Sequence, residues 1–398
     1  MKDKIIFISK DALRKDALSC YGSSHFKQPN IDELAAKGTV YHQFYTAGGS
    51  TAMAFTAMAT GQYLFTSGRK LYDGTEKALE GYNLFEDFHQ NGYSVHIAWD
   101  KSYTSFAKSH FNNEGKNTIV HSLDSIIPHH SAHVSGVFDD LSYDDLETEK
   151  GLDLVTQLFD DIAAIEGKVF LWFHLPHVFR GRNSYDSDLD IFDRIIGMAR
   201  ERWDDSSIWI SADHGQMNGA KGKFSYGYDV DNPVMQIPLI APHIAQDVDF
   251  PISNTQLSGI FGLRPLKKQE FVYCETAYYA QPMRKMAIVH DHFKLVYDKR
   301  EKRFYLYDLK WDPDENLNLY YPEFFDTDRR VWYSLNQRFF YPDWEVALRE
   351  KDLLMDEWKR VWKNGSFIEE LKQKGKYLLR ILYMKIKSTP KTIINIGK

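Results

Sequence analysis

Short apolar runs alternate with helical patterns over roughly the first 260 residues, and this alternation restricts the fold more than any other feature of the chain. The apolar runs of strand length are residues 5–9, 93–99, 169–173 and 208–211. Residues 31–37 show a helical pattern with Asn30 as cap and Gly38 as stop, and residues 189–203 show another. This order predicts an α/β fold, with a mostly parallel sheet flanked by helices.

The pattern changes near Lys267, where the apolar runs become shorter and more closely spaced. Strand-like runs at residues 271–274, 286–289, 294–297 and 304–307 predict a small antiparallel sheet. The residues beyond Pro322 are aromatic and charged, and we expect a helix through Lys363. The predicted organisation is a main α/β domain at 1–265, a small C-terminal α+β subdomain at 266–321, and a helical, aromatic and basic extension at 322–398.

The overall composition excludes several classes of protein. A net charge of −6 gives no electrostatic reason to expect nucleic acid as a partner. Cys20 and Cys274 are the only cysteines, too few for a disulfide framework, which favours a reducing compartment. The first residues enter a strand without a signal-peptide pattern, and no apolar run is long enough to span a bilayer. We therefore expect a cytoplasmic protein.

Residues capable of metal chemistry follow the predicted strands. Asp11, His174 and Asp213 each lie at the carboxyl end of an apolar run, where ligands of parallel sheets bind. Asp11 and Asp213 offer hard oxygens, His214 offers a nitrogen, and Thr51 could complete the shell as an alkoxide. Such a set suits one divalent ion, and Mn²⁺, Mg²⁺, Ca²⁺ and Zn²⁺ all remain open. Alone, Asp11 could equally be a helix cap and the Asp-His pair a turn, but the joint pattern favours a metal site.

The segment from Gly48 to Gly61 predicts a tight turn that opens directly into a helix. Gly48 and Gly49 allow the turn, and Ser50 and Thr51 are favourable N-cap residues before a run rich in alanine and methionine. This arrangement sets a threonine oxygen at the positive end of a helix dipole, where an anion can bind. A cation on that oxygen would lower the pKa of the hydroxyl and make it a nucleophile.

Two histidines flank a proline at the end of the third apolar run. His174 and His177 are candidates to grip anionic ester oxygens or to protonate a leaving group. A structural role for both is equally open.

Together these segments resemble the sulfatase branch of the alkaline-phosphatase superfamily. The matching motifs, in chain order, are DALR (11–14), LSCYG (18–22), PNIDELAAKG (29–38), TGQY (60–63), SADHG (211–215), QIPLI (236–240) and YLYDLKWDP (305–313). The resemblance covers about residues 4–319. It implies the fold predicted above and a single metal ion.

Departures from the sulfatase pattern concentrate in the nucleophile segment. Counting back from Thr60-Gly61, the position that sulfatases convert to formylglycine is Thr51, and their proline and arginine positions are Met53 and Phe55. Threonine cannot become formylglycine, and the second aspartate of the opening motif is Ala12. The pattern is instead similar to the phosphoryl-transferring branch, which includes lipoteichoic acid synthases and phosphoethanolamine transferases and uses a threonine nucleophile.

The resemblance also assigns substrate contacts. His177 occupies the position of a substrate-contacting histidine, and Lys223 is a candidate for the basic residue that many relatives carry after the Asp-His motif. We expect a metal-dependent phosphoester hydrolase or phosphotransferase with Thr51 as nucleophile. Its substrate would be an anionic ester, and a glycan ester and a lipid-linked ester are both open. The alternatives are a sulfatase that does not use formylglycine and a non-catalytic binding protein of this fold.

The C-terminal segment has its own charge pattern. Between residues 371 and 391, seven lysines and arginines without an acid lie among leucines and isoleucines. Such a segment suits peripheral contact with an anionic membrane surface, which for a cytoplasmic protein is the inner face. An amphipathic helix packed on the body of the protein is the alternative.

Overall fold

The computed structural model describes residues 2–25, 27–63, 83–99, 118–122, 145–176, 184–224, 226–242, 246–276, 285–321, 325–326, 331–334 and 337–362. His177 and the basic segment 371–391 lie outside the described residues. The roles expected for them are therefore predictions that the structure does not address.

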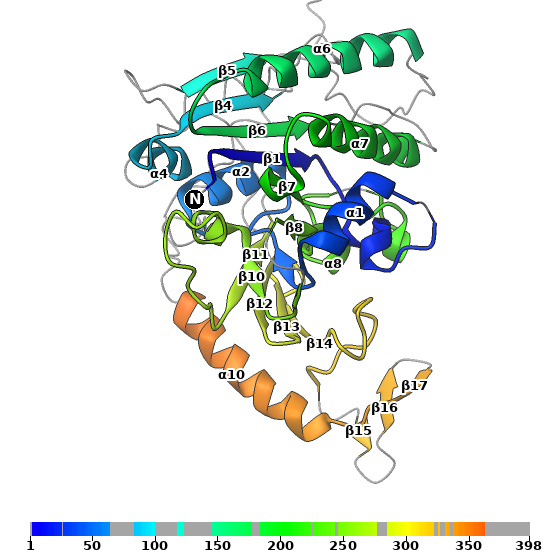
Figure 1. The fold of residues 1–398 in the computed structure, drawn as a ribbon. Helices are drawn as coiled ribbons and strands as arrows, with labels where there is room; N and C mark the ends of the chain where they lie inside the picture. Colours follow the sequence, from blue (N-terminus) through cyan, green and yellow to red (C-terminus); the bar gives the residue numbers. More distant parts are fainter. Residues whose placement is uncertain are drawn as a thin grey trace, which may run out of the picture.

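An eight-stranded sheet forms the centre of the protein (Figure 1), in the order β5-β4-β6-β1-β7-β8-β2-β9. Its strands are β1 (Lys4–Lys10), β2 (Thr39–Tyr41), β4 (Ser94–Trp99), β5 (Thr118–Ser122), β6 (Val169–Leu175), β7 (Ile208–Ala212), β8 (Leu239–Ala241) and β9 (Gln246–Val248). The five strands from β5 to β7 run parallel, and β8 pairs antiparallel with both of its neighbours. The mostly parallel sheet predicted from the sequence is thus confirmed.

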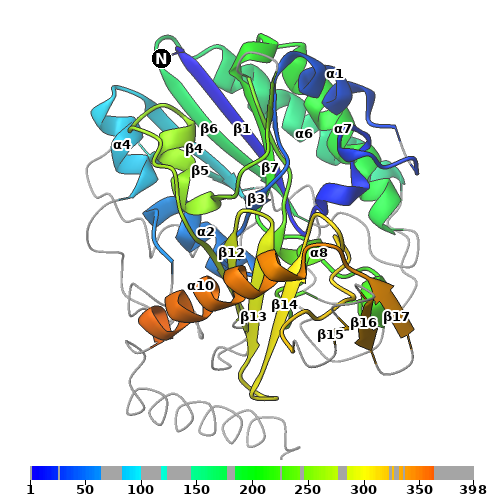
Figure 2. The same cartoon turned by 90° about the horizontal axis from the view of Figure 1, so that it is seen from below.

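Helices cover both faces of this sheet. Figure 2 shows α1, α6 and α7 on one side and α2 and α4 on the other. The helices are α1 (Pro29–Lys37), α2 (Thr51–Thr60), α4 (Leu84–Gln90), α6 (Asp145–Ala163), α7 (Ser184–Arg200), α8 (Asn232–Met235), α9 (Leu257–Ile260) and α10 (Trp344–Trp362). The short 3₁₀ helices are η1 (Lys15–Ala17), η2 (Ser19–Tyr21), η3 (Asp205–Ser207), η4 (Ala220–Gly222) and η5 (Asn254–Gln256). Covering both faces explains why the central strands are apolar throughout rather than alternating.

Two helix boundaries differ from the sequence predictions. Helix α1 begins at Pro29, because proline at the first turn loses no hydrogen bond, and Asn30 lies inside the helix rather than capping it. The Asn30 amide donates instead to Asp193 Oδ2 (2.9 Å), which ties α1 to α7. Helix α7 begins at Ser184, before its apolar stripe, and ends at Arg200.

A separate four-stranded antiparallel sheet follows, as expected, in the order β11-β12-β13-β14. Its strands are β11 (Val272–Glu275), β12 (Lys285–His290), β13 (Phe293–Asp298) and β14 (Arg303–Asp308), and helix α10 packs across β12 and β13 (Figure 2). Strands β3 (Phe44–Tyr45) and β10 (Ile252–Ser253) form a small parallel pair. None of the helices among the described residues combines the length and apolarity needed to cross a membrane.

The expectation of a continuous helix from Pro322 to Lys363 is wrong in its first half. Residues 325–340 contribute the short strands β15 (Phe325–Asp326), β16 (Val331–Ser334) and β17 (Gln337–Phe340), and the helix begins only at Trp344. Aromatic and β-branched residues fit a pleated surface better than a helix. Among the described residues after Pro322, the helix is α10.

A buried ion pair stands at the carboxyl end of β1. Lys10 Nζ lies 3.3 Å from Asp188 Oδ2 on α7, and both side chains are completely buried. The ammonium also donates to the main-chain oxygen of Asp11 (3.1 Å). A buried charge is costly unless it is paired, so each partner depends on the other.

We predict that Lys10→Met destabilises the protein by about 3–5 kcal/mol, because it leaves the Asp188 carboxylate buried without its ammonium partner. The matched control is Lys37→Met, which removes a lysine from the exposed pair with Asp205 (2.7 Å) and should cost less than about 1 kcal/mol. Urea unfolding of both variants measures the difference. Equal losses would show that the buried pair contributes no more than a surface one.

Candidate active site

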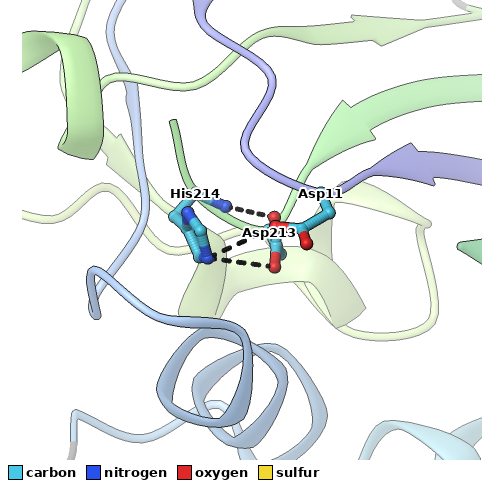
Figure 3. Close-up of side chains that lie close together, drawn as sticks. All are labelled: Asp11, Asp213 and His214. Carbon is cyan, nitrogen blue, oxygen red and sulfur yellow. Dashed lines mark hydrogen bonds and ion pairs between the residues drawn. The ribbon is translucent and has the colours of Figure 1, made fainter. Parts of the chain in front are cut away.

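Strand register brings the two aspartates of the predicted metal site together. Lys10 on β1 pairs with Ala212 on β7, so the residues that follow, Asp11 and Asp213, leave the sheet side by side. His214 comes next in the chain. Figure 3 shows the three side chains pointing toward one another, and one ligand atom from each lies within 4.8 Å of the others. Residues about 200 positions apart in the sequence thus form one buried cluster.

The cluster has the donor set and geometry of a cation site. His214 Nε2 lies 3.6 Å from Asp11 Oδ1 and 3.4 Å from Asp213 Oδ2. Both of these carboxylate oxygens are buried and have no hydrogen-bond partner among the described residues. Unpaired buried carboxylate oxygens are costly, and a divalent ion satisfies them. The residues therefore fit one metal ion, in agreement with the predicted ligands.

The remaining atoms of the cluster are fixed by the backbone. Asp213 Oδ1 accepts hydrogen bonds from the main-chain nitrogens of Ala12 (3.1 Å) and His214 (2.7 Å). His214 Nδ1 donates to the carbonyl oxygen of Gly215 (2.8 Å). Since the proton is on Nδ1, Nε2 carries the lone pair that faces the carboxylates, as metal-ligating histidines require.

Thr51 lies beside the metal ligands, as the sequence predicted. It is the first residue of α2, its side chain is buried, and its Oγ1 lies 3.3 Å from His214 Nε2. The N-cap position belongs to Ser50, whose side chain makes no capping hydrogen bond. The threonine oxygen therefore combines three influences: the positive end of α2, an imidazole acceptor and the adjacent cation site.

The two glycines before α2 serve close packing. Neither has a positive φ. A Cβ on Gly48 would lie 2.4 Å from Met53 Cβ, and one on Gly49 would lie 2.9 Å from Met235 Cε. Any side chain at Gly48 would therefore displace α2, and with it Thr51.

His174 is not one of the residues that form the metal cluster. Its ring is completely buried, its Nδ1 lies 2.9 Å from Ser9 Oγ, and it packs edge-on against Phe55, with 4.8 Å between the ring centres. Phe55 also packs against Trp99 and Trp172. The described residues thus hold His174 in an aromatic cluster beneath α2, which favours the structural alternative for this histidine.

Lys223 belongs to an acidic neighbourhood on the loop that follows the metal ligands. Its Nζ lies 2.8 Å from Asp229 Oδ2 and 3.4 Å from Asp231 Oδ2. Lys223 and Asp231 line one side of a cavity that faces the C-terminal sheet. If Lys223 contacts the substrate, it does so with an ammonium group that already forms ion pairs with Asp229 and Asp231.

Sequence reasoning missed the residues that support the loop after Asp11. The main-chain nitrogen of Arg14 donates to the Tyr185 hydroxyl (2.7 Å), and its Nη1 donates to the carbonyl oxygen of Met217 (2.7 Å). Burial lowers the pKa of Arg14, but the hydrogen bond to Asp16 and the negative charges nearby together outweigh burial, so the net shift of the pKa is upward. Burial raises the pKa of Tyr185. Arg14 was visible as part of the opening motif, whereas nothing in the pattern marked Tyr185 or Lys10.

The comparisons with known proteins agree with this geometry. Residues 3–186 match the sulfatase family model, and the fold matches that of a 2-O GAG sulfatase with a TM-score of 0.65. The N-terminal part of the chain is thus similar to sulfatases in sequence, and the fold of the whole is similar to theirs. The identity to that GAG sulfatase is 13%, over 91% of this chain and 93% of the other.

Two further structures have the same fold. A sulfatase from Bacteroides thetaiotaomicron, described with the metabolism of multiple glycosaminoglycans, has a TM-score of 0.60 and 15% identity, over 90% of this chain and 99% of its own. The phosphonate monoester hydrolase of Agrobacterium radiobacter has a TM-score of 0.56 and 14% identity, over 90% of this chain and 96% of the hydrolase. No match was found among curated proteins. The family match agrees with the expected enzyme of sulfate or phosphate esters.

We predict that Asp213→Asn weakens Mn²⁺ and Zn²⁺ binding by more than about 100-fold, which exceeds the usual effect of losing an outer-shell partner. Oδ1 already accepts two main-chain hydrogen bonds, so the amide nitrogen must take the place of Oδ2 and direct its protons at the cation. Isothermal titration measures the affinity. Asp291→Asn, at an exposed carboxylate, is the control. Retained affinity in Asp213→Asn would exclude Asp213 as a ligand.

Proposed function

We propose that this protein is a metal-dependent phosphoester hydrolase or phosphotransferase that uses Thr51 as its nucleophile. The observation that carries the proposal is the position of Thr51 Oγ1, 3.3 Å from His214 Nε2 at the edge of the Asp11–Asp213–His214 cluster. A hydroxyl at that place is the only oxygen nucleophile that α2 presents to the cluster from its first turn.

Each residue has a defined task in this proposal. Asp11, Asp213 and His214 hold the cation, which when bound lowers the pKa of a neighbouring hydroxyl and offsets charge on the substrate. Thr51 Oγ1 attacks phosphorus and gives up its proton, which is transferred to the leaving oxygen; a bond from Oγ1 to phosphorus forms, and the bond from phosphorus to the leaving oxygen breaks. The first turn of α2 points free main-chain N–H groups at the phosphoryl oxygens.

The second half of the reaction restores the nucleophile. Water, or the hydroxyl of an acceptor, attacks the phosphothreonine, and the new oxygen–phosphorus bond replaces the bond to Thr51. The proton of the attacking hydroxyl returns to the threonine oxygen. Hydrolysis and transfer differ only in the identity of this second nucleophile.

The choice of phosphate over sulfate rests on the residue type at position 51. Threonine cannot be converted to formylglycine, so a formylglycine-dependent sulfatase reaction has no nucleophile here. Phe55 stands in a buried aromatic cluster with Trp99 and Trp172, so this turn of α2 carries no cationic side chain toward an ester. Sulfate-ester hydrolysis without formylglycine is the second candidate, and the sulfatase family match supports it.

The nucleophile assignment predicts that Thr51→Ala lowers turnover of bis(p-nitrophenyl) phosphate by about 10³-fold or more. Thr51→Ser should retain measurable turnover, because it keeps the hydroxyl. The matched control is Thr56→Ala, a buried threonine on the same helix whose hydroxyl donates to the carbonyl oxygen of Ala52 (2.7 Å). Unchanged turnover in Thr51→Ala would refute the assignment.

A second measurement separates the two candidate functions. We expect turnover of aryl phosphate diesters, with a phosphoryl adduct detected by mass spectrometry on the peptide that contains Thr51. Turnover of p-nitrophenyl sulfate alone, without that adduct, would overturn the phosphate proposal and support the sulfate alternative.

A further inference from the structure

A second cavity lies between the loop that follows His214 and the C-terminal antiparallel sheet. Its volume is about 390 Å³, which is within the range of small-molecule sites. One wall comes from residues 221, 223, 230 and 231 of that loop, and the other comes from residues of β12, β13 and β14. The ligands of the metal cluster are not among its lining residues.

The charged groups of this cavity are already paired with one another. Lys221 Nζ lies 2.7 Å from Asp231 Oδ1, and Lys223 Nζ lies 2.8 Å from Asp229 Oδ2, an aspartate that Lys285 also contacts. These pairs hold long side chains in fixed positions. The lining is therefore polar and preorganised.

The glutamates that line the cavity also have partners within the protein. Glu315 is buried and pairs with Lys294 (2.6 Å), and Glu301 accepts a hydrogen bond from the Tyr305 hydroxyl (2.5 Å). A phosphate or sulfate would meet lysines that are already neutralised and would be repelled by the adjacent carboxylates. A divalent cation would have to displace a lysine from its partner. Both simple ions are therefore disfavoured.

A neutral polyhydroxyl ligand fits the same groups. An ammonium paired with one carboxylate keeps further N–H donors, and each carboxylate keeps further lone pairs. Sugar hydroxyls both donate and accept, so they can use the two kinds of group at once. Tyr305 and Tyr307 lie on one face of β14 and line the cavity, whereas Leu306 between them is buried in the core. The two rings are nearly parallel, with 6.3 Å between their centres, and they add apolar area for the C–H groups of a sugar ring.

The loop that forms one wall is continuous with the metal ligands. The loop starts at His214, and the centre of the Tyr226 ring lies 4.4 Å from the centre of the His214 imidazole. Lys294 donates to Asn232 Oδ1 (2.9 Å), which anchors the far end of the loop to the C-terminal sheet. A ligand in the cavity would thus rest on the segment that also positions His214.

We propose that this cavity is a carbohydrate-binding site for an uncharged portion of a sugar. The binding itself does not depend on the proposed function. The further statement that the bound sugar belongs to an ester substrate rests on that function. The site would make a glycan ester, rather than a simple phosphate ester, the substrate class.

The experiment is saturation-transfer-difference NMR on the full chain with methyl β-D-glucoside, methyl β-D-galactoside and N-acetylglucosamine. We expect signal from at least one sugar. Tyr305→Ala should weaken binding of that sugar by about fivefold or more, through lost ring contact. Lys223→Gln, at a half-exposed residue with little risk to folding, should weaken it by about twofold or more.

Two controls separate this inference from the catalytic proposal. Phe224→Ala removes an exposed aromatic ring that does not line the cavity, and binding should be unchanged. Thr51→Ala should also bind the sugar normally, whether or not it has lost turnover. Absence of signal from every sugar, equal signal in Tyr305→Ala, or Lys223-dependent binding of inorganic phosphate in place of sugar would each overturn the proposal.

Discussion

The parallel pairing of β1 with β7 is the constraint on which the rest of the site depends. Hydrogen bonding between these strands sets Lys10 opposite Ala212, so Asp11 and Asp213 leave the sheet at adjacent points. Because successive side chains of a strand point to opposite faces, a slip of one residue would direct the metal ligands away from each other. The apolar runs that drive the strands together therefore also determine the distance between two carboxylates that are about 200 residues apart in the chain.

Burial of these carboxylates carries a free-energy cost. Two carboxylate oxygens face the lone pair of His214 without a hydrogen bond among the described residues, and such groups are costly away from water. The site lowers this cost in three ways: main-chain N–H groups hold Asp213, the Lys10–Asp188 pair anchors the end of β1, and a cation can satisfy the free oxygens. Thr51, the first residue of α2, has its hydroxyl 3.3 Å from Nε2 of the same imidazole.

The sequence predicted the features that depend on local chemistry and failed where distant contacts decide. Continuous apolar runs identified the central strands, and chemically capable residues at strand ends identified the metal cluster. Asn30 looked like a cap because its residue type favours that position, but its amide reaches Asp193 on another helix. Aromatic residues beyond Pro322 suit either a helix or a strand, and pairing between β16 and β17 decides for the strand. The catalytic role expected for His174 stays a prediction, and the structure adds that this ring lies beside Ser9 and Phe55.

The sequence by itself determined the alternation of strands and helices, the identity of the candidate metal ligands and the presence of threonine at the position that sulfatases convert. Those properties follow from residue type and from short-range periodicity, which are written in the chain order. Only the tertiary structure decided which oxygens are left unpaired, which histidine nitrogen faces them, and how the lysines and carboxylates beside the C-terminal sheet neutralise one another. Each of these depends on distances between segments that no local pattern encodes, because packing sets them only after the sheet has formed.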